Sequence, residues 1–182
     1  MNTVLVVIVV LVVIVGGFFG WYISASNNIK RADIKVSEAL SGIDVALTKR
    51  YDVLTKMLDI VKNYQAYERE TLLQIVNLRA GMSMKERNEA SRNMDQVSSD
   101  IRVLAENYPE LRSSQNFAEL QKSVIDVEEH LQAARRLYNA NVTSYNNLIV
   151  AFPSSIVASN LGATQKAFFE ADATKRQDVK MF

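Results

Sequence analysis

Residues 1–29 carry no charged side chain, because every Lys, Arg, Asp and Glu lies at or after Lys30. Residues 4–15 read VLVVIVVLVVIV, and the apolar stretch continues to Ile23. About twenty helical residues reach about 30 Å, which is the thickness of the hydrocarbon core of a bilayer. A lone segment in lipid must satisfy its own backbone hydrogen bonds, and only a helix does so. The sequence therefore predicts a transmembrane anchor over residues 1–25.

A cleavable secretory signal is the alternative to this anchor. No basic residue precedes the apolar stretch, which is also longer than the hydrophobic region of an ordinary signal. Trp21 and Tyr22 form an aromatic pair of the kind found at membrane interfaces. Residues 23–25, Ile-Ser-Ala, could serve as a weak cleavage site. We favour the uncut anchor, and the signal stays open as the alternative.

The flanks of the span predict its orientation. Met1 and Asn2 precede it, whereas Lys30, Arg31 and Lys35 follow it. Basic residues favour the cytoplasmic side, so we expect a short N-terminus outside and the bulk of the chain in the cytoplasm. The three basic residues should lie in the anionic headgroup layer with Trp21 and Tyr22, where each charge contributes at most about 1 kcal/mol. The absence of cysteine agrees with a reducing compartment.

Two glycines within the span predict close packing of membrane helices. Gly16 and Gly20 have the GxxxG spacing, which lets two helices approach closely in lipid. Gly17 and the neighbouring aromatic residues make this face less regular. We expect self-association through the span and therefore a homo-oligomer.

The remainder of the chain predicts an all-α fold: a single N-terminal transmembrane helix followed by an antiparallel bundle of long helices. The only prolines are Pro109 and Pro153, and only three glycines follow the span. Long segments without such breakers favour long helices. We assign residues 26–171 to the bundle and residues 172–182 to a polar C-terminal tail.

Apolar residues at steps of three or four predict the individual helices. The first series could continue from the membrane helix without a break, and a second segment is predicted from about Glu68 to Gly81. Ser83 and Glu86 have capping-box spacing, after which a helix continues to Pro109. The first series consists of Val36, Leu40, Ile43, Leu47, Tyr51, Leu54, Leu58 and Val61.

A polar turn at residues 109–115 is predicted to precede the most regular helix, with Asn116 as its N-cap. After Pro153, Ser154 or Ser155 is predicted to cap a short last helix that carries Ile156, Val157, Leu161, Phe168 and Phe169. The stripe of the regular helix consists of Phe117, Leu120, Val124, Val127, Leu131, Ala134, Tyr138, Val142, Tyr145, Ile149 and Phe152.

A Tyr-Asn pair occurs twice at a spacing of seven, as Tyr138-Asn139 and Tyr145-Asn146. Seven helical residues turn by about 700°, so the two tyrosines should lie on one inward stripe with the asparagines beside it. A tyrosine there fills the core and needs a partner for its hydroxyl. We therefore expect a packing role, with the asparagines hydrogen-bonded to a facing helix to fix its register.

Little in the chain indicates catalysis. His130 is the only histidine, and Val127 stands where a di-iron helix would carry glutamate. We expect His130 at the surface or its boundary. There is no cysteine nucleophile and no glycine-rich phosphate loop, and a net charge of +1 argues against nucleic acid as a partner. We expect no enzyme activity, no cofactor and no metal site.

Three stretches resemble the LemA family of bacterial membrane proteins, and the resemblance covers nearly all of residues 28–170. They are GIDVALTKRYDVLTKMLDIVKNYQAYE (42–68), ENYPELRSSQNFAELQ (106–121) and VEEHLQAARRLYNANVTSYNNLIVAFPSSIVA (127–158). The most specific positions are Lys49, Arg50, Tyr51, Asp52, Tyr108, Pro109, Asn116, Phe117, Arg135, Arg136, Tyr138, Asn139, Tyr145, Asn146, Phe152, Pro153 and Ser154.

This resemblance implies an N-terminal anchor with its short end outside, an antiparallel helical bundle and location in a bacterial inner membrane. Among the motif residues, those expected in packing or partner contacts are Lys49, Arg50, Tyr51, Asp52, Tyr108, Asn116, Arg136, Tyr138, Asn139, Tyr145 and Asn146. The chain departs from the family pattern at Thr55, where members often have proline, at Tyr67, where they often have histidine, and at His130, where they often have arginine. Without proline at Thr55 the first long helix should be straighter.

The sequence as a whole favours a structural or interaction module that assembles at the cytoplasmic face of the membrane. Membrane lipid, other copies of the chain and an unidentified membrane protein are its expected partners. A signal transducer that acts along the first helix is the alternative, and a membrane-tethered hydrolase is a weaker one.

Overall fold

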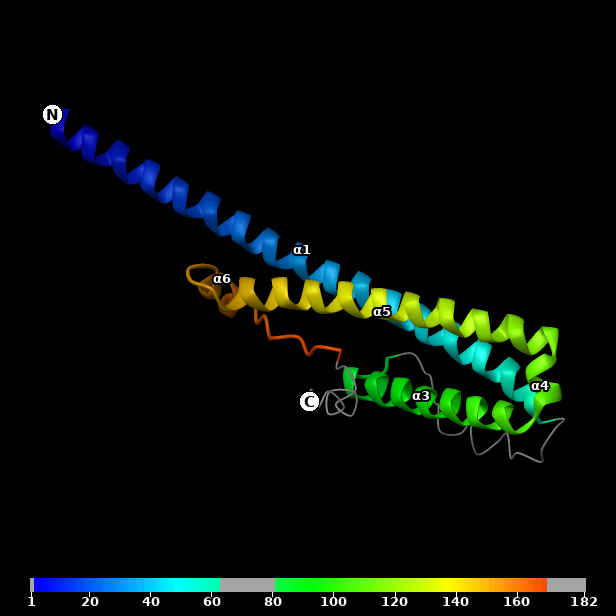
Figure 1. Cartoon of the computed structure of the whole chain (residues 1–182). Helices are drawn as coiled ribbons and strands as arrows, with labels where there is room; N and C mark the ends of the chain where they lie inside the picture. The colour runs from blue at the N-terminus through cyan, green and yellow to red at the C-terminus, as the bar shows by residue number, and fades with distance from the viewer. Residues whose placement is uncertain (1, 63–80, 170–182) are drawn as a thin grey trace, which may run out of the picture. The chain divides into compact units, whose positions relative to one another are not determined.

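A computed structural model describes residues 2–62 and 81–169 of the chain, and the regular structure there is α-helical throughout, as predicted (Figure 1). The predicted helix over residues 68–80 and the predicted polar tail fall outside these residues, as does Tyr67. The helices are α1 (Asn2–Val61), α3 (Met84–Asn107), α4 (Pro109–Ser113), α5 (Gln115–Val150) and α6 (Ser154–Asn160).

Helix α1 joins the apolar stretch to the first bundle helix without a break over 60 residues. It passes through Thr55, where a proline would remove a backbone donor and bend the helix. The Thr55 hydroxyl instead donates to the Tyr51 carbonyl at 2.8 Å. Among the described residues, α1 is the one helix long and apolar enough to cross a membrane.

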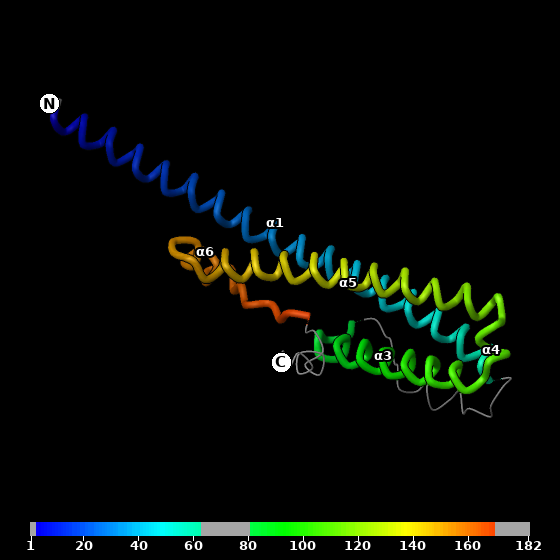
Figure 2. Tube along the Cα trace, in the orientation of Figure 1, coloured from blue at the N-terminus to red at the C-terminus, as the bar shows by residue number. Residues whose placement is uncertain are grey.

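The chain forms two compact units. The first unit consists of Met1–Glu38 and Ala140–Lys166, and the second of Ala39–Asn139 and Ala167–Phe182. Helices α1 and α5 each contribute a part to both units. Within the second unit, α1 and α3 run in the same direction and α5 runs opposite to both, as the trace in Figure 2 shows.

The core of the second unit is formed by one face each of α1, α3 and α5. The predicted three-and-four spacing puts these side chains inside, and each large aliphatic side chain contributes about 1.5–3 kcal/mol by leaving water. The most deeply buried are Ile43, Leu47, Val61, Met94, Leu111, Phe117 and Leu131. Leu40 and Tyr51, from the same predicted series, are half-buried.

The core of the first unit is smaller and lies against α1 after the apolar stretch. Ala25, Ile29 and Val36 are buried on α1. They are covered by the end of α5 and by α6, whose buried residues are Val142, Tyr145, Ile149, Val157 and Ala158. The side-chain amide of Asn141 donates to the Lys35 carbonyl at 3.1 Å and fixes α5 against α1 in this unit.

The N-terminus of α3 has the predicted capping box. The Ser83 amide donates to Glu86 Oε2 at 2.7 Å, and the Glu86 amide donates to Ser83 Oγ at 3.3 Å. Gly81 precedes it with a φ of 79°, a conformation that residues with a Cβ rarely adopt. This local chemistry starts a new helix independently of the core.

The predictions around residues 109–116 were wrong in two respects. The predicted polar turn contains helix α4, which Pro109 begins because its fixed φ and missing N–H suit the first helical position. Asn116 is not an N-cap, since α5 already begins at Gln115. Ser114 is extended and its carbonyl accepts the Ala118 N–H at 3.0 Å, so Ser114 occupies the cap position.

The predictions for the end of α5 and for α6 were also partly wrong. Phe152 was placed on the buried stripe, but α5 ends at Val150 and the Phe152 side chain is 83% exposed. Neither Ser154 nor Ser155 caps α6, because both are helical residues and the cap position is Pro153. The Ser154 hydroxyl instead donates to the carbonyls of Leu148 and Ala151 at 2.6 and 2.9 Å.

Helix α6 is shorter than the sequence predicted. It ends at Asn160, and Gly162 follows with a φ of 64°. The Ala163 N–H donates back to the Ala158 carbonyl at 3.0 Å, which is the closure of a glycine C-cap. Leu161, Phe168 and Phe169 therefore lie outside the helix, and residues 163–169 run without regular structure.

Candidate functional site

Arg50 lies at the centre of a cluster of charged side chains in the second unit. It is 3% exposed, although an isolated charge is costly to bury. Its Nη2 lies 2.5 Å from Asp95 Oδ1 on α3 and 3.1 Å from Glu128 Oε2 on α5. Its Nη1 donates to the Ser91 carbonyl at 3.4 Å. One guanidinium of α1 thus joins all three long helices of the unit.

Arg135 on α5 extends this cluster. Its guanidinium donates to the Ser91 hydroxyl and lies 4.8 Å from the centre of the Phe169 ring. Burial lowers the pKa of Arg135, and the attraction of Glu128 and Asp95 opposes part of that shift. Two guanidinium groups and two carboxylates therefore share one partly buried region, with no net charge between them.

Helical periodicity explains why these polar groups face inward. Arg50 follows the buried Leu47 by three positions and precedes the buried Leu54 by four. Arg135 follows Leu131 by four and precedes Tyr138 by three. Residues at such steps share one helix face.

Asp44 and Arg87 form a second ion pair in this unit, between α1 and α3. Arg87 donates through Nε and Nη2 to the two Asp44 carboxylate oxygens at 2.6 and 2.8 Å, which is bidentate geometry. Arg87 also donates to the Met82 carbonyl. The hydrogen bond with Asp44 raises the pKa of Arg87. This pair fastens the start of α3 to α1.

Asn139 binds the main chain of Phe169 from both sides of its amide group. Its Nδ2 donates to the Phe169 carbonyl at 2.9 Å, and its Oδ1 accepts the Phe169 N–H at 2.8 Å. The neighbouring Tyr138 hydroxyl donates to the Ala167 carbonyl at 2.8 Å. Phe169 is 3% exposed, so its side chain belongs to the core of the second unit.

Asn146 forms the same pair of hydrogen bonds with the main chain of Lys166, within the first unit. Its Nδ2 donates to the Lys166 carbonyl at 3.0 Å, and its Oδ1 accepts the Lys166 N–H at 2.9 Å. The Lys166 ammonium lies 2.9 Å from Asp33 Oδ1 and 5.6 Å from the centre of the Tyr145 ring. A lysine between a carboxylate and an aromatic face is held by both.

The prediction that Asn139 and Asn146 bind a facing helix was wrong. They bind the main chain of the irregular segment before Glu170, whereas a facing helix was expected. Seven residues of a helix rise about 10.5 Å, and three residues of an extended chain cover about 10 Å. The heptad spacing on α5 thus matches the spacing from Lys166 to Phe169. Tyrosine packing accounts for only part of the repeat.

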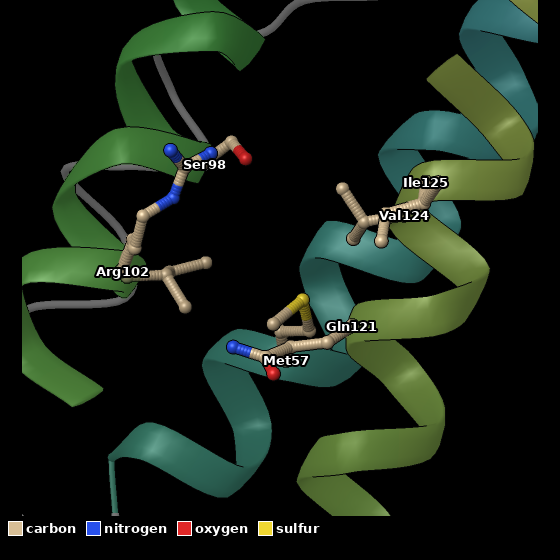
Figure 3. A pocket seen from close by; sticks show the side chains of 7 residues that line it. Met57, Ser98, Arg102, Gln121, Val124 and Ile125 are labelled. Atoms are coloured by element: carbon tan, nitrogen blue, oxygen red, sulfur yellow. The ribbon is translucent and has the colours of Figure 1, made fainter. Parts of the chain in front are cut away.

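A pocket of about 270 Å³ lies between α1, α3 and α5 of the second unit (Figure 3). Aliphatic side chains and Met57 form much of its wall, with Ser98, Arg102 and Gln121 as its polar members. It is somewhat smaller than most ligand pockets. Its lining residues are Met57, Ser98, Ile101, Arg102, Gln121, Val124 and Ile125, so it contains neither a carboxylate nor a histidine.

Several predicted contact residues lie at the surface. Lys49, Asp52 and Arg136 are exposed and form no ion pair with another described residue. Asn116 is exposed, and Tyr51 and Tyr108 are half-buried. Of the predicted charged residues, only Arg50 joins the cluster.

Sequence reasoning missed most of the cluster. It selected Arg136 as a contact residue, although Arg135 has the spacing from Leu131 and Tyr138 that predicts an inward position. The partners on α3, Ser91 and Asp95, carried no such signal, because Ser and Asp at inward positions interrupt an apolar stripe. The missed residues are Ser91, Asp95, Glu128 and Arg135 of the cluster, and Asp44 and Arg87 of the second ion pair.

The predicted membrane residues lie on α1 in the first unit. Trp21 and Tyr22 are half-buried, and Lys30, Arg31 and Lys35 are exposed. A Cβ built on Gly16 or Gly20 would have no neighbour within 4 Å among the described residues. The glycine face is thus open to another helix or to lipid.

His130 is exposed, as predicted. Its Nδ1 lies 2.6 Å from the Asp126 carbonyl, one helical turn earlier. Over residues 2–62 and 81–169, no three His, Cys, Asp or Glu side chains are grouped in a way that could hold a metal ion. The contacts described above position the long helices and the segment over residues 166–169.

Sequence comparison relates the chain to known proteins. The sequence model of the LemA family matches residues 39–182. The chain is also 29% identical over 169 residues to Protein LemA of Metamycoplasma hominis, an alignment that covers 90% of this chain and 77% of that protein.

Proposed function

The chain belongs to the LemA family, and from this premise we propose that it is a membrane-anchored helical interaction protein whose copies assemble at the cytoplasmic face of a bacterial membrane. Family membership and the apolar part of α1 support membrane association. The side of the membrane and the assembly of copies are the proposal.

The observation that carries the proposal is the exposed apolar surface at the start of α1. Every described side chain from Thr3 to Gly20 is exposed, with Val4 at 66% and Val13 at 68%. A continuous apolar surface of this size is disfavoured in water and stable in lipid. Because the same helix continues to Val61 in the bundle, the anchor and the interaction module are parts of one element.

The charges after the span support the cytoplasmic side. Lys30, Arg31 and Lys35 follow the apolar stretch and are exposed on α1. Basic residues beside a span are retained in the cytoplasm during insertion.

The open glycine face supports assembly of copies. Gly16 and Gly20 lie one turn apart on α1, and no described residue covers them. Confinement to a membrane raises the effective concentration of the copies, so weak helix contacts suffice.

Alkaline carbonate extraction of membranes tests the anchor. A spanning helix keeps the protein in the membrane pellet, whereas a peripheral protein is released. Intact-mass measurement on the extracted protein then excludes cleavage. Release into the supernatant, or a mature chain that begins after Ala25, would contradict the proposal.

Native mass measurement of the detergent-solubilised protein tests the assembly. We expect dimers or larger species, and we expect monomers after Gly16→Leu combined with Gly20→Leu, because bulky residues keep the helices apart. Gly17→Leu is the matched control, since it adds the same bulk outside the GxxxG spacing. A monomer at every concentration of the unchanged protein would refute assembly.

A further inference from the structure

We propose that the end of α5, the turn after it and α6 form a second membrane contact, in which Val150, Phe152, Ile156 and Leu161 enter the interfacial layer of the bilayer that α1 crosses. This inference rests on the proposed anchoring through α1. It assigns a lipid-facing role to a part of the chain more than a hundred residues after the span.

The first observation is the exposure of these side chains. Phe152 is 83% exposed, Val150 59%, Ile156 51% and Leu161 38%. Val157 and Ala158, on the other face of α6, are buried in the core of the first unit. Helix α6 is thus fixed by one face while large apolar groups point away from the protein. Clusters of exposed apolar residues of this kind mark contacts with membranes or other proteins.

The second observation is the absence of charge. Residues 137–165 contain no Lys, Arg, Asp or Glu, although about a quarter of the residues of a typical soluble domain are charged. Residues 1–29 are the other uncharged stretch of this length in the chain. Nearly all of both stretches belongs to the first unit, which thus combines the predicted span with a second surface that has no charge to keep it in water.

The third observation is the level of the turn along α1. Burial on α1 begins with Trp21 and Tyr22 and is complete at Ala25 and Ile29. The hydrogen bond from Asn141 to Lys35 sets the register of the two helices. Since both rise about 1.5 Å per residue in opposite directions, the turn at residues 151–153 falls about level with residues 23–25.

This level coincides with the predicted membrane interface. Trp and Tyr are enriched where headgroups meet acyl chains. An apolar turn beside Trp21 and Tyr22 would therefore lie at the headgroup boundary, where interfacial helices bury their apolar face by about 5–10 Å. Lys30 and Arg31 follow at the depth where anionic headgroups attract basic residues. Lipid is the partner that matches both the chemistry and the position of this surface.

Depth-dependent fluorescence quenching tests the contact directly, because the chain has no cysteine and accepts single labels. Phe152→Cys and Ile156→Cys would each carry an environment-sensitive fluorophore in the full-length protein. The protein is placed in lipid nanodiscs at one chain per disc. Ala140→Cys, exposed on α5 in the same unit, is the matched control. Phe19→Cys, exposed within the apolar stretch, reports the span.

We expect lipids brominated near the headgroup to quench the labels at residues 152 and 156 about twofold more than the label at 140, which is some 15–18 Å further along α5. Emission at 152 and 156 should shift to the blue. The label at 19 should be quenched by bromine deeper in the acyl chains.

The remaining outcomes separate this inference from the proposed function. Quenching at 19 without quenching at 152 and 156 would overturn the second contact and leave the anchor standing. Absence of quenching at all four positions would overturn both. Shielding of the label at 152 only in discs with two chains, and without lipid quenching, would overturn the lipid contact in favour of a contact between copies.

Discussion

Arg50 shows how a charged side chain is accommodated inside this bundle. It is 3% exposed, and Asp95 and Glu128 approach it from two other helices. The attraction between buried charges is largely offset by the loss of their hydration, so the cluster adds little net stability. Loss of one partner is different, because it leaves a buried charge without compensation. We infer that the cluster contributes mainly by disfavouring wrong helix registers.

Asp95→Ala should lower the free energy of unfolding by about 2–3 kcal/mol, because Arg50 would keep only Glu128 as its ionic partner. Chemical denaturation of the detergent-solubilised protein measures this change. Asp52→Ala is the control, because Asp52 is exposed on α1 and should change stability by less than about 0.5 kcal/mol. Equal effects of the two substitutions would show that the cluster is not coupled to folding.

Tyr138→Phe and Tyr145→Phe should differ, although the two residues occupy equivalent positions of the heptad. Tyr138 would lose the hydrogen bond to the Ala167 carbonyl and about 1 kcal/mol of stability. The Tyr145 hydroxyl donates to no other described residue, so its loss should be nearly neutral. Hydrogen exchange of the Phe169 amide should accelerate only in Tyr138→Phe. Faster exchange in both variants would show that ring packing, shared by both, holds the segment.

At the scale of elements, local signals succeeded where a helix end is set by its own residues. The capping box at Ser83 and the start of α4 at Pro109 require only neighbouring atoms. The end of α6 was predicted wrongly because the apolar residues after Gly162 suggested a longer helix. The glycine C-cap at Gly162 ends it instead. The cap of α5 was predicted wrongly because both Ser114 and Asn116 are residue types that suit that position, and the helix begins one residue before Asn116.

Gly42→Ala and Gly81→Ala should have opposite effects on stability. Gly42 lies within α1 with free space around it, so alanine should stabilise the protein by about 0.5–1 kcal/mol. Gly81 has a φ of 79°, and alanine there should cost about 1–2 kcal/mol. Denaturation midpoints of the two variants give the comparison. Destabilisation by Gly42→Ala would mean that α1 requires flexibility at that position.

At the scale of the whole molecule, charged side chains are unevenly distributed along the sequence. The uncharged residues 1–29 and 137–165 are far apart in sequence and lie largely in one compact unit. Residues 39–136 carry most of the charged side chains. The uncharged surfaces are the ones suited to contact lipid, and the charged surfaces are the ones suited to contact water.

Cysteine accessibility should establish the orientation. A cysteine at Ser99, exposed on α3, should react with a membrane-impermeant maleimide only after the membrane is permeabilised. Glu106→Cys, exposed near the end of the same helix, should behave identically. Labelling of either site in intact right-side-out vesicles would place the second unit outside the cell.

The sequence alone determined the apolar span, the all-α class, the unbroken faces of the long helices and the family. These features depend on composition and on periodicity, and each can be evaluated within one segment. The tertiary structure decided which polar residues meet: Arg50 with Asp95 and Glu128, Asn139 with Phe169, and Asn146 with Lys166. It also decided that the turn after α5 lies level with the end of the span. Such pairings depend on the register between segments distant in sequence, and the periodicity of one helix does not contain that register.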